Sequence, residues 1–545
     1  MKDTHDESLS FWTKLAYGAG DFGPAITANI SVFYLLFFFT NVVGLSGATA
    51  GSVLMIGKIA DAVNDPIIGM WSDQTRTPWG RRLPWMIFGA IPFGLFFVLQ
   101  WFIPSFLGEL TKSETFLWAY FVIIGILFNV TYTAVSLPYQ SLTPELTLDY
   151  NERTNLNSFR FSFSIGGSIL SLILYLLIFK ADNLDQTQRF IILAVICSIL
   201  SIIATLWCTL GIQERGTKPI LNPRQKIIPG TILAALGVLG IIYSLYRAIN
   251  SGLDYLFFSF LLLGLQLLAF GLTLRLGRLE PHLNDARAAK QKQEENDSPS
   301  LPFKEQLKIV FNNRPFLYVI GIYLCSWLAV QLTASIIVYF VVSWMRLPEA
   351  QSGLVALAVQ GTALIMLFFW QWVSQKLDKK VVYSLGVVIW IIAQFGLFSV
   401  QPGQEALMYF LAFLAGWGVS VAYLIPWSMV PDVIELDELK TGQRREGTFY
   451  AFMVLLQKFG LALGLFLVGI ALDLAGFKAQ VPGGPIPVQP DSALWAIRMA
   501  IGPLPAIFLL ISLVLAYFYP LTRTVHAEIL LQLAQKKQER SEKEA

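Results

Sequence analysis

The chain has 545 residues, of which 55% are hydrophobic and 14% are charged, and its formal net charge is +3. Charged residues make up about a quarter of an ordinary soluble protein, so this composition excludes a soluble globular protein and indicates a polytopic membrane protein. A net charge this small gives no reason to expect nucleic acid as a partner.

Long apolar segments predict the membrane crossings, because a spanning helix needs about 20 mostly apolar residues. A first set of six lies near residues 17–41, 47–71, 84–104, 115–139, 159–180 and 190–211. Two further apolar runs follow, near 228–247 and 254–276. A second set of six lies near 316–343, 350–375, 381–400, 404–429, 449–475 and 497–520. The pattern predicts an all-α polytopic membrane protein with two six-helix halves and an inserted two-helix hairpin.

The predicted domains follow from these segments. Residues 1–215 form the N-terminal six-helix half, and residues 315–522 form the C-terminal one. Between them, residues 216–314 contain the hairpin, at about 228–276, and a polar cytoplasmic linker. Residues 523–545 form a charged tail.

Lys and Arg accumulate on the cytoplasmic side of membrane proteins, and this rule sets the expected orientation. With the N-terminus inside, most basic residues of the chain fall in inner loops, among them Arg81, Arg82, Lys379 and Lys380. We therefore expect a multi-pass protein of the plasma (inner) membrane with both termini in the cytoplasm.

Two aspartates interrupt the second predicted span, Gly51–Trp71. Asp61 and Asp65 are four residues apart and so share one helix face, and Lys58 lies three residues before Asp61 on the same face. An ionised carboxylate at bilayer depth costs at least roughly 2.5 kcal/mol unless it is paired or hydrated. The cluster therefore requires opposite charge from other helices or a bound cation.

A hard cation such as Na⁺ prefers oxygen ligands. Asn64, beside Asp65, and Thr133, in the fourth predicted span, would add such oxygens. Lys458 is the one charge in the apolar stretch Thr448–Leu472, and we expect it to balance charge near mid-span. The alternatives are a structural ion pair between the aspartates and a lysine, with no bound ion, and a Lys458 side chain that extends to the membrane interface.

An internal repeat supports two related halves. LPYQSLTPEL (Leu137–Leu146) and IPWSMVPDV (Ile425–Val433) both combine apolar–Pro–aromatic with a following Pro–acid–apolar triplet, at the ends of the fourth and tenth predicted spans. Transporters built from two such repeats bind their substrate near the bilayer midplane.

Several motifs carry a family resemblance. KLAYGAGDFG, KIADAVNDPIIGMWSD, RTPWGRRLPW and PDVIELDELKTGQRREGTFYAF occur in this order along the chain. Together they resemble the glycoside–pentoside–hexuronide:cation symporters, the melibiose-permease branch of the major facilitator superfamily. The resemblance implies twelve helices, alternating access and symport driven by Na⁺, Li⁺ or H⁺, with no other cofactor.

The family's functional positions map onto single residues here. Its cation-site carboxylates match Asp61 and Asp65, its neighbouring basic residue matches Lys58, and its eleventh-helix lysine matches Lys458. A tyrosine and a threonine of its fourth helix match Tyr132 and Thr133.

The family's substrate positions match less well. An arginine that contacts sugar in the family matches Arg160. Two sugar-binding aspartates of the galactoside carriers are replaced by Ala25 and Ser136, and a stacking tryptophan is replaced by Gln140. We expect Tyr132 and these four residues to line the substrate cavity, with a substrate other than a galactoside.

Charged residues at the inner helix ends are candidate gates, because pairs that form in one state bias the opening of a transporter. Simple anchoring at the membrane surface is the alternative for the basic ones. The expected gating residues are Asp21, Arg81, Arg82, Glu145, Asp149, Asp432, Arg444 and Arg445.

The expected function is secondary active transport: cation-coupled symport of a sugar or glycoside by alternating access. One alternative keeps the cation site and changes the cargo to a lysolipid or other amphiphile, because LIPWSMVPDVIE also resembles the vertebrate lysolipid carriers. Another is a membrane sensor that no longer transports. We expect no enzymatic activity, since no nucleophile–base set or phosphate-binding loop is recognisable. The expected partners are a small-molecule substrate and the lipid bilayer, and the expected state is a monomer.

Overall fold

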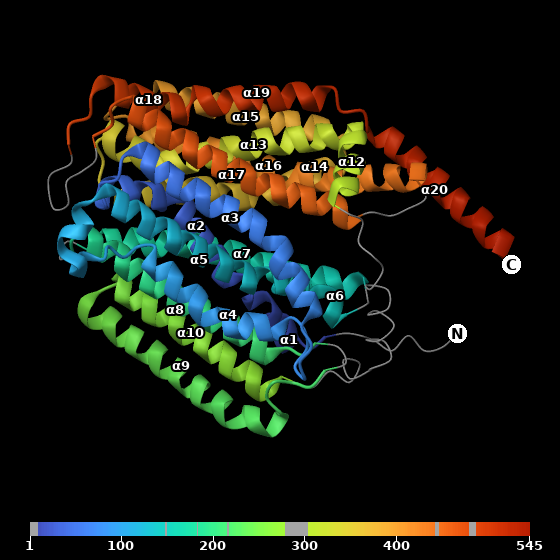
Figure 1. The fold of residues 1–545 in the computed structure, drawn as a ribbon, viewed down its shortest axis with the longest axis horizontal. Helices are drawn as coiled ribbons and strands as arrows, with labels where there is room; N and C mark the ends of the chain where they lie inside the picture. The colour runs from blue at the N-terminus through green and yellow to red at the C-terminus, as the bar shows by residue number, and fades with distance from the viewer. Residues whose placement is uncertain are drawn as a thin grey trace. The chain divides into compact units, whose positions relative to one another are not determined.

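The computed structural model describes residues 9–147, 150–181, 184–214, 217–277, 303–441, 446–478 and 487–544. Throughout these residues the secondary structure is helical, without a strand beyond an isolated bridge between Thr77 and Gly80. The chain divides into two compact units, one holding the helices up to α10 and the other holding the helices from α12 (Figure 1). The expected linker at 278–300 lies outside the described residues.

The first unit contains the helices of the N-terminal half and the inserted hairpin. These are α1 (Phe11–Ala19), α2 (Phe22–Ile30), η1 (Ser31–Leu35), η2 (Phe38–Val42), α3 (Gly47–Gln74), α4 (Leu83–Leu99), η3 (Ser105–Lys112), α5 (Glu114–Gln140), α6 (Thr143–Leu146), α7 (Tyr150–Phe179), α8 (Gln186–Gly211), α9 (Pro223–Ser251) and α10 (Tyr255–Leu276).

The second unit contains the C-terminal half. Its elements are α12 (Phe303–Asn312), α13 (Arg314–Tyr339), η5 (Phe340–Trp344), α14 (Ala350–Ser374), α15 (Lys379–Ser399), α16 (Glu405–Thr441), α17 (Glu446–Leu474), α18 (Asp491–Ile501), α19 (Pro503–Tyr517) and α20 (Arg523–Glu544).

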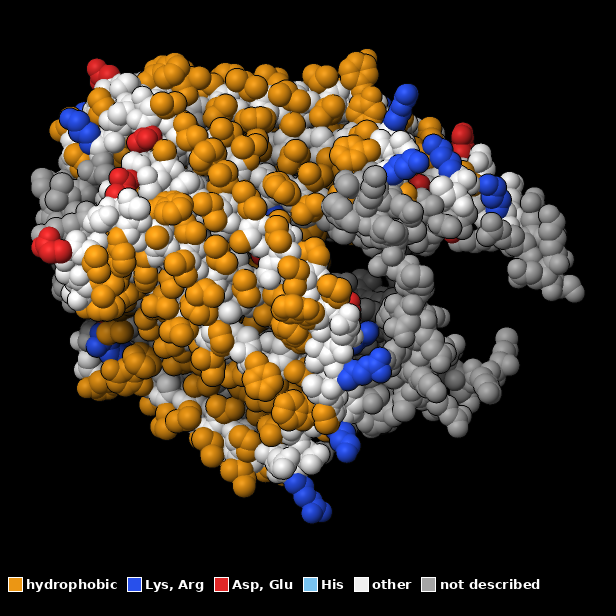
Figure 2. Space-filling model, viewed as in Figure 1, with side chains coloured by type: hydrophobic (Ala, Val, Ile, Leu, Met, Phe, Trp, Pro, Cys, Tyr) orange, Lys and Arg blue, Asp and Glu red, His pale blue; other side chains and the backbone are white. Residues whose placement is uncertain are grey.

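Among the described residues, 11 helices are long and apolar enough to cross a membrane. α4 is a shorter apolar helix, and α3 is 28 residues long but carries the charged residues Lys58, Asp61 and Asp65. Figure 2 shows hydrophobic side chains over most of the visible helical surface, with charged side chains gathered towards the helix ends. The prediction of an all-α polytopic membrane protein is confirmed.

The helices that carry the two aspartates and Thr133 are held together at their starts. Ser46 caps α3, and its backbone N–H donates to Glu114 at the start of α5 over 3.0 Å. One turn further along, the Trp118 indole of α5 donates to Ser52 of α3 over 2.9 Å. At Gly57 a side chain would begin 3.2 Å from the Asn129 amide of α5, so glycine lets the two helices approach closely. The middles of α3 and α5 therefore face each other at side-chain distance.

The inserted hairpin is closely packed because glycines line the face that α9 and α10 share. A Cβ at Gly237 would collide with the backbone of Leu268, and a Cβ at Gly271 would collide with the backbone of Ala234. Figure 1 shows the two helices side by side, in green. Small residues let helix backbones approach in a membrane, where burial from lipid adds no driving force.

The hairpin is attached to the N-terminal half through α8. The Trp207 indole donates to the Thr273 hydroxyl over 2.9 Å, and the Gln266 amide donates to the Leu200 carbonyl over 2.8 Å. Both bonds join α10 to α8, so the hairpin belongs to the first unit.

Candidate functional site

The two aspartates of α3 converge on one hydroxyl group of α5. Thr133 Oγ1 lies 3.0 Å from Asp61 Oδ1 and 3.1 Å from Asp65 Oδ1. Asp61 is almost fully buried, with 1% of its surface exposed, and Asp65 is half-buried. A hydroxyl carries a single proton, so it donates a full-strength hydrogen bond to only one of the two carboxylates at a time. At the other contact an oxygen faces an oxygen, an arrangement that a proton or a cation stabilises.

Lys58 supplies positive charge on the same helix. Its Nζ lies 3.6 Å from Asp61 Oδ2 and donates to Asn129 Oδ1 over 3.1 Å. Asn129 in turn donates to the Gly125 carbonyl over 2.7 Å, which fixes the orientation of its amide. One ammonium and two carboxylates leave one net negative charge when all three groups are ionised.

The sequence analysis missed Asn129. The residue spacing could have predicted it, because Asn129 lies one helical turn before Thr133 and so shares the face of α5 that meets α3. Asn64 lies on α3 beside Asp65, and its Nδ2 is buried without a hydrogen-bond partner. A buried amide group without a partner is costly, and an additional acceptor or a bound species next to it would lower that cost.

The other predicted charge partner, Lys458, is half-buried on α17, in the second unit. Its predicted charge balance with the aspartates stays a prediction.

The predicted substrate residues lie in different surroundings. Arg160 of α7 pairs with Asp21, between α1 and α2, with Nε 3.3 Å from Oδ2, and its guanidinium lies 5.6 Å from the centre of the Tyr139 ring. This pair joins a residue predicted to bind substrate with one predicted to act as a gate. Tyr132 lies near the cation candidates instead, with Lys58 Nζ 6.0 Å from the centre of its ring.

The three departures from the galactoside pattern are all described. Ser136 is buried on α5, Gln140 is exposed at the end of α5, and Ala25 is half-buried on α2. Their role in binding a substrate stays a prediction.

A buried carboxylate organises the loop between α3 and α4. Glu214, which follows α8, is 3% exposed and accepts backbone N–H bonds from Arg81, Arg82 and Leu83 over 2.9, 2.7 and 2.8 Å. Gly80 makes this approach possible, because its φ is +111° and a Cβ there would collide with the carboxylate. The sequence analysis missed Glu214.

Arg82 is also held by its side chain. Its guanidinium pairs with Asp73, and its Nη1 donates to the Ser72 hydroxyl over 2.7 Å. Arg82 is therefore held at two places in the first unit: its side chain contacts the end of α3, and its backbone N–H contacts Glu214 after α8. Four predicted gating residues lie outside what the structure describes: the side chain of Glu145, and Asp149, Arg444 and Arg445. Their gating role stays a prediction.

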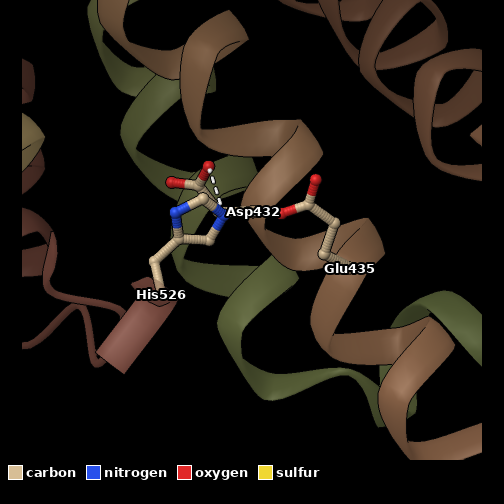
Figure 3. A group of neighbouring side chains, drawn as sticks. All are labelled: Asp432, Glu435 and His526. Carbon is tan, nitrogen blue, oxygen red and sulfur yellow. Dashed lines mark hydrogen bonds and ion pairs between the residues drawn. The ribbon is translucent and has the colours of Figure 1, made fainter. Parts of the chain in front are cut away.

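Asp432 of α16 has partners on two other helices. Lys379 Nζ of α15 lies 2.7 and 2.8 Å from its two carboxylate oxygens. His526 of α20 lies beside it, with Nε2 3.5 Å from Asp432 Oδ1 and 2.5 Å from Glu435 Oε2 (Figure 3). The spacing of these three side chains would suit a metal ion, since one His526 nitrogen and one carboxylate oxygen each of Asp432 and Glu435 lie within 4.8 Å of one another. Lys379, however, already neutralises Asp432. These contacts join α15 and α20 to α16, and the predicted gating role of Asp432 stays a prediction.

The chain also resembles known proteins over almost its whole length. The family described as "MFS/sugar transport protein" matches residues 16–236 and 227–523. An uncharacterized symporter of Synechocystis is 61% identical over 542 residues, which cover 98% of each chain. The isoprimeverose transporter of Lactiplantibacillus pentosus is 23% identical and covers 98% of this chain and 92% of its own.

A relative with a different cargo is similar at about the same level. The sodium-dependent lysophosphatidylcholine symporter 1 of Mus musculus is 25% identical and covers 94% of this chain and 86% of its own. Among solved structures, the inward-open xylose transporter XylE of E. coli has a TM-score of 0.57 at 14% identity, with 94% and 96% of the two chains covered. The chain is thus a major facilitator in fold, and it belongs to the MFS/sugar transport protein family.

Proposed function

We propose that the protein is a secondary active transporter that couples the movement of Na⁺ or H⁺ to the uptake of a sugar or glycoside. It works by alternating access in the plasma membrane, with both termini in the cytoplasm. The observation that carries the proposal is the Thr133 hydroxyl between the carboxylates of Asp61 and Asp65.

The site has the charge that a monovalent cation needs. Asp61, Asp65 and Lys58 leave one negative charge, which one Na⁺ or one proton neutralises. The ligands on offer are carboxylate and hydroxyl oxygens, with the Asn64 amide as a further candidate, and these are the donors that hard cations prefer. The competing hypothesis is a purely structural ion pair, in which Lys58, 3.6 Å from Asp61 and shared with Asn129, holds the carboxylates without a bound ion; the aspartate variants below distinguish the two.

Coupling requires that the cation binds the outward-open and inward-open states with different affinity, since a ligand shifts only an equilibrium between states that it distinguishes. Lys458 is our candidate for the group that makes this difference. It is a mid-helix lysine on α17, and it would compete with the cation for the aspartates in one state. Asp432, Arg82 and the other charged residues at the helix ends would bias the same equilibrium.

The sugar cargo rests on the family and on the isoprimeverose transporter. The lysophosphatidylcholine symporter favours a second candidate, an amphiphile carried by the same cation site. Ala25 and Ser136 also fit either cargo, because the galactoside-binding acids are replaced at both positions.

Uptake into liposomes tests the proposal. Purified protein is reconstituted, and uptake of a panel of labelled sugars and of a labelled lysophospholipid is measured with an inward Na⁺ gradient, an inward H⁺ gradient or neither. We expect ion-driven accumulation of at least one sugar, and its loss in Asp61→Asn and Asp65→Asn. Asp473→Asn is the matched control, because Asp473 is exposed at the end of α17.

The outcomes separate the candidates. Accumulation of the lysophospholipid alone would replace the sugar proposal with the amphiphile. Undiminished ion-driven uptake in either aspartate variant would remove that residue from the cation site. Flux that never depends on either ion would exclude symport.

A further inference from the structure

A groove in the second unit is lined by α14, α15, α16 and α19. It has a volume of about 740 Å³, and aromatic side chains form much of its wall, among them Trp370, Trp417 and Tyr517. Its polar side chains are few, and the charged one is Lys380, at the start of α15. All of these residues belong to one compact unit, so the groove is a feature of that unit alone.

The groove is open at its side, where its apolar wall is exposed, as expected of a helix surface that contacts lipid. Leu385 and Val388 of its wall are 48% and 46% exposed, and Tyr517 is 76% exposed. The lining is almost wholly apolar, so the groove suits a hydrocarbon chain and offers little to a sugar. Its occupant therefore enters from the membrane.

Lys380 gives the groove a charged end. The side chain is half-buried, and within the described residues it has no acidic partner. Its neighbour Lys379 differs, because Lys379 is neutralised by Asp432. The nearby hydroxyl of Ser384 is also occupied, since it donates to the Lys380 carbonyl over 2.8 Å. The Lys380 ammonium thus remains as the group that an anion would meet.

A second polar atom lies deeper along the groove. The indole Nε1 of Trp417 is buried and has no hydrogen-bond partner, although Trp417 lines the groove. A side chain at Gly418 would begin 2.7 Å from the Gly386 carbonyl, so this part of α16 lies level with Gly386 of α15. Gly386 is six residues beyond Lys380, about 9 Å along the helix. The wall of the groove therefore holds a polar nitrogen at this depth, which the protein encloses, and Lys380 is left as the charged contact for a headgroup.

The length of the groove matches one leaflet. Its lining runs along α15 from Lys380 to Ile389, which is about 14 Å of helix. Half of the hydrocarbon core of a bilayer is about 15 Å thick. An acyl chain whose headgroup sits at Lys380 therefore reaches about the middle of the bilayer at the far end.

We propose that this groove binds an anionic glycerophospholipid of the surrounding membrane. Its phosphate lies on Lys380, and one acyl chain lies along the aromatic wall of α14, α15 and α16. A basic pocket between helices, at the end of an apolar surface, is the arrangement that selects anionic headgroups. Lys376, whose Nζ lies 3.7 Å above the Trp372 ring at the end of α14, adds positive charge on the same side. The site is separate from Asp61 and Asp65, and its test needs no transport.

Native mass spectrometry of the full-length protein with defined lipids tests the proposal. Phosphatidylglycerol and phosphatidylcholine with the same acyl chains are titrated into the delipidated protein, and the fraction with one bound lipid is compared. We expect tighter binding of phosphatidylglycerol. We also expect a loss of about fivefold in its affinity in Lys380→Gln, the usual effect of one basic residue at an anionic membrane surface.

Two further variants separate the groove from general surface charge. Lys440→Gln removes an exposed lysine of α16 away from the groove and should leave the preference for phosphatidylglycerol unchanged. Val388→Trp fills the groove from an exposed position, where a bulky apolar side chain is compatible with folding, and should weaken binding of both lipids.

Three results would overturn the site. Equal retention of the two lipids would mean an ordinary lipid shell, and an equal loss in Lys440→Gln would mean unspecific attraction to positive charge. Unchanged binding in Val388→Trp, with an unchanged melting temperature as evidence of folding, would mean that no acyl chain occupies the groove.

Discussion

The contact of Thr133 with both aspartates can be tested by removing its hydroxyl group alone. Thr133→Val keeps the β-branched shape and deletes the atom that lies 3.0 and 3.1 Å from the two carboxylates. Thr133→Ser keeps the hydroxyl and loses a methyl group, so it is the matched control.

The direction of the effect follows from the role of the oxygen. If Thr133 Oγ1 is a ligand, the bound state loses a contact with a charged group, worth about 1.5–3 kcal/mol. The free state also loses its hydrogen bond to a carboxylate, which offsets part of that loss. A net difference of ~1.4 kcal/mol corresponds to a tenfold weaker affinity for the cation.

The assay is calorimetric or thermal titration of the purified protein with NaCl, against choline chloride at constant ionic strength. We expect Thr133→Val to bind Na⁺ about tenfold more weakly and Thr133→Ser to bind it nearly as the wild type does. An increased affinity in Thr133→Val would refute the reasoning, because it would mean that the hydroxyl competes with the cation for the carboxylates. An unchanged affinity would place the cation elsewhere.

Three further changes test the contacts around the site and at the helix ends. Gly80→Ala should lower the melting temperature markedly, because φ is +111° there and a Cβ would collide with Glu214. The control is Gly403→Ala, which also has a positive φ but has open space around it. Equal losses of melting temperature in the two variants would exclude a special role for the Glu214 carboxylate. Asn129→Leu should weaken Na⁺ binding and cost about 1–3 kcal/mol of stability, since it leaves the Lys58 ammonium without its amide acceptor; normal titration and unfolding curves would contradict this. His526→Ala should release α20 and speed its cleavage by a protease, and cleavage at the wild-type rate would show that the contact with Glu435 does not hold the helix.

The sequence predicted the cation candidates because helical periodicity is local. Residues four apart share a face whatever the neighbouring helices are, so Asp61 and Asp65 had to lie together once α3 was a helix. The same locality explains the correct prediction of an all-helical membrane protein, since the length and composition of each apolar run determine whether it can cross a bilayer.

Contacts between helices were harder to predict from the sequence. That Thr133 bridges the aspartates follows from the packing of α3 against α5, with Gly57 beside Asn129. Nothing in either helix alone specifies that packing. Asp21 and Arg160 were assigned to different tasks for the same reason, because 139 positions separate them and their ion pair depends on how α1 and α2 meet α7.

What the sequence by itself determined is therefore the helical, membrane-spanning nature of the chain and the charges that each apolar segment carries. Only the tertiary structure decided which charges meet: Glu214 with the backbone of the loop after α3, Asp432 with Lys379 and His526, and Lys380 with an apolar groove. The physical reason is that composition and periodicity act within one helix. The pairing of buried polar groups depends instead on close packing between helices that are distant in the chain.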